Sequence, residues 1–182
     1  MSATTTALPT GTWNVDPTHS HVAFRVKHLG ISTVRGSFGA FEGQLVIGDD
    51  GSASATGSVK VDSIDTSDAD RDGHLKAADF FDVENYPEIT FQSTDITPTG
   101  DDTFDITGDL TLHGVTKPIT LKAEVGGQET DPFGNPRVGL EATGELSRGD
   151  YGMKFNMALG SGNIAVSDKV KLDLDISAIK AS

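Results

Sequence analysis

The sequence contains no cysteine, which excludes a disulfide framework, a thiol nucleophile and a cysteine-ligated metal site. It has no run of about 20 apolar residues of the kind that forms a membrane-spanning helix. Its first eleven residues lack the basic segment and apolar core of a secretory signal peptide. At 182 residues the length favours a single domain. We therefore expect a cytoplasmic protein with a flexible segment over residues 1–11 and one domain over residues 12–180.

Positive charge is also scarce. The chain has 14 Lys and Arg residues against 27 Asp and Glu residues, which gives a formal net charge of −13 at pH 7. A strongly acidic protein is repelled by the phosphates of nucleic acids and by anionic membrane surfaces. We therefore expect neither nucleic-acid binding nor strong docking on anionic membranes, and a solvated surface accounts for the charge.

Strand patterns broken by glycine are abundant instead. Between eight and ten segments alternate apolar and polar residues, and the clearest is near the C-terminus, where Val170, Leu172, Leu174 and Ile176 share one face. The stretch 126–136 is polar and predicts a loop. So many half-apolar strands favour antiparallel sheets that close into a barrel or split into a sandwich. The predicted fold class is all-β.

Residues 67–91 interrupt this pattern and predict a short helical insert. Ser67 is a suitable N-cap, with Asp70 three residues later as an imperfect capping box. Pro87 disfavours helical geometry at Tyr86, so we expect the helical segment to end there.

Several strands carry small residues on the same face as their large apolar residues. Small inward side chains would leave the interior underfilled, and a barrel of about eight strands could then hold one apolar ligand. Strand bends or close backbone approaches would explain the glycines equally well, so a hollow and a filled interior both stay open. The small residues are Ala55, Gly57, Gly108, Ala142 and Gly144.

Two patterns of polar residues suggest other functions. Residues 68–79 place acids at positions 1, 3 and 5 and glycine at position 6 of a calcium-type loop, but position 12 is Asp79 instead of the usual Glu and no entering helix is predicted. His74, near Arg71 and Asp79, is the best candidate for an acid or base acting on a lipid head group. His19 and His21 share a strand face but are too few for a metal site. We expect no enzyme, metal or cofactor.

Several motifs follow one another along the chain: Asp16–Ser20 with Phe24 and His28, Arg35–Phe38, Arg71–Leu75, Asp79–Val83, Tyr86–Phe91, Gly108–Pro118, Arg148–Met153 and Val166–Val170. In their order and spacing they resemble the motifs of the YceI-like family over residues 13–179. This resemblance implies an extended, antiparallel, lipocalin-like β-barrel with a helix beside it. It also implies an elongated apolar pocket for polyisoprenoid chains or similar long amphiphiles, often in a homodimer.

Residue pattern and resemblance together predict a lipid-binding protein that holds an isoprenoid or similar tail inside the barrel, with the polar head near the mouth. The segment 147–163 contains apolar residues among glycines and predicts a lid, whereas Phe80 and Phe81 predict a permanent plug. The candidate ligand-binding residues are Phe24, Val26, Phe38, Phe41, Phe91, Ile106, Leu110, Leu112, Met153 and Phe155.

Overall fold

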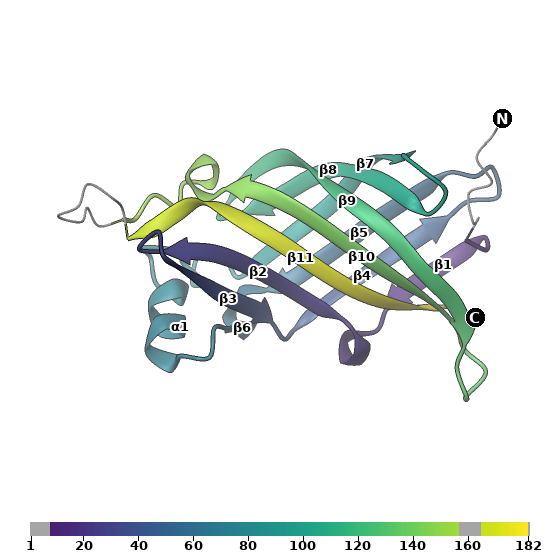
Figure 1. The fold of residues 1–182 in the computed structure, drawn as a ribbon, viewed down its shortest axis with the longest axis horizontal. Helices are drawn as coiled ribbons and strands as arrows, with labels where there is room; N and C mark the ends of the chain where they lie inside the picture. The colour runs from purple at the N-terminus through teal and green to yellow at the C-terminus, as the bar shows by residue number, and fades with distance from the viewer. Residues whose placement is uncertain (1–7, 157–164, 182) are drawn as a thin grey trace.

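The computed structural model describes residues 8–156 and 165–181, which form an elongated antiparallel β-barrel with one short α-helix beside it (Figure 1). The helix α1 spans Ala69–Lys76, and three 3₁₀ turns, η1 to η3, span Pro17–His19, Val61–Ser63 and Arg148–Tyr151. The strands are β1 Gly11–Val15, β2 His21–His28, β3 Ser32–Phe38, β4 Phe41–Ile47, β5 Ala53–Lys60, β6 Ile64–Asp65, β7 Glu88–Pro98, β8 Thr103–Leu112, β9 Val115–Thr130, β10 Pro136–Ser147 and β11 Val166–Lys180.

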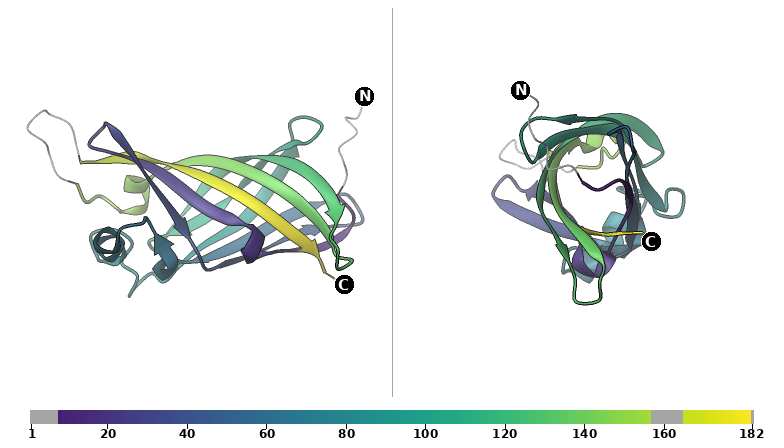
Figure 2. Two further views of the ribbon diagram at one scale, coloured as in Figure 1. Left: turned by 60° about the horizontal axis from the view of Figure 1, so that its bottom comes forward. Right: turned by 90° about the vertical axis from the view of Figure 1, so that its right-hand side faces the viewer.

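Eight strands close the barrel in the order β1-β4-β5-β7-β8-β9-β10-β11, and the ring is completed where β1 pairs with β11 (Figure 2). The long strand β11 has two partners on the same side. Its last residues, Ala178–Lys180, pair with β1, whereas Val166–Asp175 pair with β2. Strands β2, β3 and β6 therefore leave the ring as a flap beside α1. The prediction of an antiparallel barrel with a short helical insert is confirmed.

Two local predictions need correction. The polar stretch 126–136 is mostly strand, because β9 continues to Thr130 and β10 begins at Pro136, with a turn over residues 131–135. The N-cap of α1 is Asp68 and not Ser67: the Asp68 carboxylate accepts a hydrogen bond from the Arg71 amide at 3.0 Å. Ser67 has a φ of +66°, a left-handed conformation outside the extended region that N-caps adopt.

The helix also ends earlier than predicted. It stops at Lys76, and residues 77–86 form a series of turns. The amides of Phe81 and Val83 donate back to the carbonyls of Leu75 and Lys76, so the turns fold against the end of α1. No helix in the described part of the chain is long and apolar enough to cross a membrane.

Buried side chains form three clusters along the barrel. The first, at the α1 end, contains Phe80, Leu110, Leu112, Tyr151 and Met153. The central cluster contains Ile106, Leu121, Ala123 and Ala142, and the cluster at the opposite end contains Trp13, Val125, Val138 and Ala178. Trp13 is 1 % exposed, and its indole N–H donates to the Pro9 carbonyl at 3.0 Å. Buried apolar side chains therefore lie at both ends of the barrel as well as in its middle.

Candidate ligand-binding site

A cavity of about 960 Å³ occupies the inside of the barrel. Along β11 every second residue lines it, from Val170 through Leu172, Leu174 and Ile176 to Ala178. The eight residue steps from Val170 to Ala178 span about 26 Å, so the cavity is long and narrow. It ends near Leu75 and Phe80 at the α1 end. Most of the lining is aliphatic or aromatic, as in pockets that bind apolar molecules.

Nine of the ten candidate ligand-binding residues line this cavity, and only Phe155 does not. The Phe155 ring lies instead against Phe80 and His74, with ring centroids 5.3 Å apart in both pairs. Leu75 of α1, which was not among the candidates, also lines the cavity. Contact of the nine residues with a ligand stays a prediction.

The small inward residues fall into two groups. Ala55 and Gly57 of β5 open onto the cavity, and a Cβ added at Gly57 would meet only the Glu42 carbonyl, at 3.5 Å. At Gly108 and Gly144, by contrast, neighbouring side chains already fill the space. An added Cβ would lie 2.5 Å from the Phe91 ring at Gly108 and 2.6 Å from a Leu121 methyl at Gly144. The hollow interpretation therefore holds for β5, and the close-packing interpretation holds for Gly108 and Gly144.

Arg148 closes the α1 end of the cavity. It is 5 % exposed and lines the cavity wall, yet its guanidinium donates to four backbone carbonyls at 2.8–3.1 Å. Burial lowers the pKa of Arg148, while nearby Asp168 acts in the opposite direction. The Arg148 carbon Cζ also lies 5.9 Å from the centroid of the Phe80 ring. The acceptors are the carbonyls of Met153, Phe155, Val166 and Ser167.

These contacts bear on the predicted lid over residues 147–163, of which residues 157–163 lie outside the described part of the structure. The described part is held in place, because Arg148 joins it to the start of β11. Asn156 adds two hydrogen bonds to the backbone of Val166, at 2.7 and 3.1 Å. Residues 147–156 thus form part of the closed end.

The polar residues of the calcium-type pattern have local partners. Asp68 caps α1, and Asp72 accepts hydrogen bonds from the amide and hydroxyl of Thr66. Among the described residues no group of three or more His, Cys, Asp or Glu side chains is placed to hold a metal. His74 lies at the surface, 3.1 Å from the Asp79 carboxylate, with its ring against Phe80. Helix capping and ring packing account for these residues.

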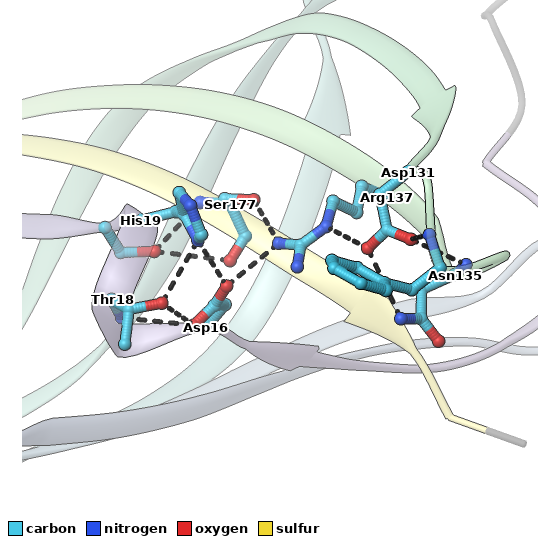
Figure 3. Close-up of polar contacts among 9 residues, drawn as sticks. Asp16, Thr18, His19, Asp131, Asn135, Arg137 and Ser177 are labelled. Atoms are coloured by element: carbon cyan, nitrogen blue, oxygen red, sulfur yellow. Dashed lines mark hydrogen bonds and ion pairs between the residues drawn. The ribbon is translucent and has the colours of Figure 1, made fainter.

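A polar network on the outside of the barrel holds the end remote from α1 (Figure 3). Arg137 of β10 donates to Asp16 at 2.9 Å and to Asp131 at 2.7 Å, and His19 lies 2.7 Å from Asp16. Arg137, followed by His19, holds the pKa of Asp16 well below its usual range. Arg137, together with the Asn135 amide, lowers the pKa of Asp131 to about 2. The network ties η1 to the β9–β10 turn.

Comparison with known proteins places this fold. The model of the YceI-like domain matches residues 13–178, nearly the whole described barrel. The chain belongs to the YceI-like family. Two of its motifs are now located: Asp16–Ser20 includes two members of the outer network, and Arg148–Met153 contains the arginine that closes the α1 end.

YceI-like relatives support this assignment. The chain is 43% identical to Protein YceI of Escherichia coli (strain UMN026) over 145 residues, which cover 79% of this chain and 75% of the relative. It is 40% identical to a UPF0312 protein of Pseudomonas putida (strain W619), with coverage of 89% and 82%.

Solved structures show the same fold. The YceI protein of Campylobacter jejuni superposes with a TM-score of 0.74 at 28% identity, covering 86% of this chain and 90% of that one. BcnA of Burkholderia cenocepacia superposes with a TM-score of 0.76 at 23% identity, covering 90% and 98%. A third barrel, described as a polyisoprenoid binding domain from Saccharophagus degradans, gives a TM-score of 0.71 at 19% identity, with coverage of 93% and 98%.

Proposed function

We propose that this protein binds a polyisoprenoid or a similar long-chain amphiphile inside its barrel, without catalysing a reaction on it. The observation that carries the proposal is the long apolar cavity of about 960 Å³. Pockets for small molecules have volumes of about 300–1,000 Å³, so this cavity is at the large end of that range. Its length suits a chain better than a compact ligand.

The chemistry of the lining supports the same ligand class. Burying one methylene group contributes about 0.8 kcal/mol, so a long hydrocarbon can bind tightly with few polar contacts. The guanidinium of Arg148 is already occupied by four backbone carbonyls. The binding energy would therefore come mainly from desolvation of the tail.

The Saccharophagus degradans barrel, described as a polyisoprenoid binding domain, has the same fold as this chain. That likeness is one of fold, so the ligand class proposed here rests on the cavity of this chain. The homodimer implied by the family resemblance is part of the proposal, and sedimentation velocity at several protein concentrations tests it. A single monomeric species throughout would contradict the dimer and leave the binding proposal standing.

The binding proposal is tested by delipidating the protein and titrating it with a fluorescent long-chain lipid. Ala55→Phe places a ring inside the cavity. Ser54→Phe adds a ring of the same size at the preceding residue of β5, which does not line the cavity. We expect the amount of lipid bound at saturation to fall strongly for Ala55→Phe and to be unchanged for Ser54→Phe. No binding by the wild type, or equal binding by all three proteins, would contradict the proposal.

A further inference from the structure

The ladder between β5 and β7 covers only part of β5. It pairs Thr56–Lys60 with Glu88–Gln92, five residue pairs in all. The first residues of β5, Ala53–Ala55, pair with β4 on their other side, and no β7 residue of the described chain pairs with them. The wall of the barrel therefore has an unpaired seam between Ala53–Ala55 and the second half of β7.

A bulge in β7 starts this seam. The register between β7 and β8 shifts between Ser93 and Asp95, and the Ser93 hydroxyl accepts the Ala55 amide hydrogen at 2.8 Å. A side chain thus takes the bond that a β7 carbonyl would otherwise accept. Bulges bend the strand that carries them and are frequent at barrel rims. Beyond it the β7–β8 hairpin stands away from the β4–β5 hairpin (Figure 2, left).

The cavity reaches the surface at this seam. On one side it is lined by Asp49, Ser52 and Ala53, and on the other by Thr94 and Asp95. Asp49, Thr94 and Asp95 are exposed to solvent, although they border the same cavity as the buried core residues. The two edges of the seam are therefore also two edges of an opening.

A cluster of buried side chains lies at each end of the barrel in the described structure. Arg148, Phe80 and Met153 are buried at the α1 end, and Trp13 is buried at the other. We propose that the ligand enters and leaves through the seam between Ala53–Ala55 of β5 and Thr94–Pro98 of β7, a lateral portal. This inference rests on the proposed function and adds to it the route of the ligand.

The charge of the rim narrows the class of ligand. Asp49 and Asp95 border the opening. The one cation among the described lining residues, Arg148, lies at the far end with four of its five N–H donors bound to backbone carbonyls. An anionic group passing or resting at the portal would meet like charges at short range. The portal therefore favours a lipid whose polar end is uncharged, such as an alcohol, over one that ends in a carboxylate or phosphate.

Because the chain has no cysteine, a single introduced thiol can be labelled specifically. Thr94→Cys places the label at the portal, and Glu84→Cys places it on an exposed turn beyond α1. Each variant is compared before and after reaction with a bulky maleimide, by following uptake of a pyrene-labelled long-chain alcohol from phosphatidylcholine vesicles. We expect the label at residue 94 to slow uptake at least about tenfold and the label at residue 84 to leave the rate unchanged, because a blocked entrance lowers the association rate.

The portal would be overturned if the label at residue 84 slowed uptake more than the label at residue 94, if both labels slowed it equally, or if neither label slowed it. Equilibrium binding by the unlabelled protein, measured in the same samples, separates this failure from failure of the proposed function. If the unlabelled protein binds no probe, both proposals fail. If it binds and residue 94 has no effect, the portal alone is wrong.

The charge of the ligand is tested with a pyrene-labelled alcohol and the fatty acid of the same chain length. We expect the wild type to take up the alcohol faster and the difference to shrink several-fold in the double variant Asp49→Asn/Asp95→Asn. Asp70→Asn/Glu84→Gln removes two exposed charges near α1 and serves as the matched control. An unchanged difference in the portal variant, or an equal change in both variants, would overturn the role of the acidic rim.

Discussion

The wall of the barrel formed by β8 to β11 differs from the wall formed by β4 and β5 in strand pairing and in the burial of its inward residues. Strands β8 to β11 pair along nearly their whole length, with ten residue pairs between β8 and β9 and eleven between β10 and β11. Their inward side chains, such as Ile106, Leu121 and Val138, border the cavity but are themselves buried in apolar clusters. On β4 and β5 no residue is fully buried, and the five-pair ladder to β7 ends at the seam.

The difference shows how a chain with a single core makes space for a ligand. The long-ladder wall, β8 to β11, supplies bulky residues that pack together and hold the frame. The wall formed by β4 and β5 contributes Ala53, Ala55 and Gly57, small residues that border the cavity without filling it. We therefore expect substitutions in β8 to β11 to change mainly stability, and substitutions in β4 and β5 to change mainly ligand binding.

The largest effect is expected where the long-ladder wall ends in Arg148. Arg148→Met would leave four carbonyls at the closed end without their donor. A buried polar group left unsatisfied costs about 1–3 kcal/mol, so the substitution should cost at least about 3 kcal/mol in total. We expect the free energy of unfolding to fall by this amount in urea denaturation. Lysine has fewer donors than arginine but still has some, so the free energy of unfolding should fall by less in Arg148→Lys than in Arg148→Met. Wild-type stability in Arg148→Met would show that the closed end does not support the long-ladder wall.

The next largest effect compares one alanine on each wall. Both alanines line the cavity, but Ala142 of β10 is 3 % exposed within the central cluster, whereas Ala55 of β5 is only half-buried. Ala142→Phe should overpack the core and lower the free energy of unfolding by about 1–3 kcal/mol. Ala55→Phe should change it by less than about 0.5 kcal/mol. Equal losses in urea denaturation would mean that the two walls are equally packed.

A smaller gain is expected at Tyr151, which packs against the long-ladder wall. Its side chain is 2 % exposed, and its hydroxyl is the one buried side-chain polar atom of the described residues without a hydrogen-bond partner. Burial, followed by the nearby Asp150, raises the pKa of Tyr151. Tyr151→Phe should raise the free energy of unfolding by about 1 kcal/mol, because no bond is lost. Tyr86→Phe, at a more exposed position, is the control, and a loss in Tyr151→Phe would reveal a partner.

The smallest effect concerns acid and the outer network that holds the remote end of the long-ladder wall. Since Arg137 lowers the pKa of Asp131 in the folded state, the ionised carboxylate stabilises the fold above its unfolded pKa of about 4. This contribution is lost as the pH falls toward the folded pKa of about 2. Asp131→Asn should therefore flatten the fall in stability between about pH 4 and pH 2. An equal flattening by Asp101→Asn, on the exposed β7–β8 turn, would contradict a specific role for the network.

Local patterns in the sequence determined most of the strands and their inward faces. Alternation along residues 170–176 requires no knowledge of neighbours, because side chains of a strand point to opposite sides in turn. The same rule placed nine of ten candidate residues on the cavity wall. The short helix was also predictable, although its N-cap was not. Ser67 has a left-handed conformation, and its backbone amide donates a hydrogen bond to the carboxylate of Asp65 in β6.

The tertiary structure decided which small residues leave empty space. Gly108 and Gly57 look alike in sequence, but the Phe91 ring fills the space at the first, whereas only the Glu42 carbonyl lies near the second, at 3.5 Å. The reason is that cross-strand neighbours depend on register. Phe155 follows the alternation of Met153 yet lies outside the cavity, because its segment is held by Arg148 and not by a strand partner. The seam likewise requires a bulge at Ser93 and a ladder that stops at Thr56, and both arise only when distant strands meet.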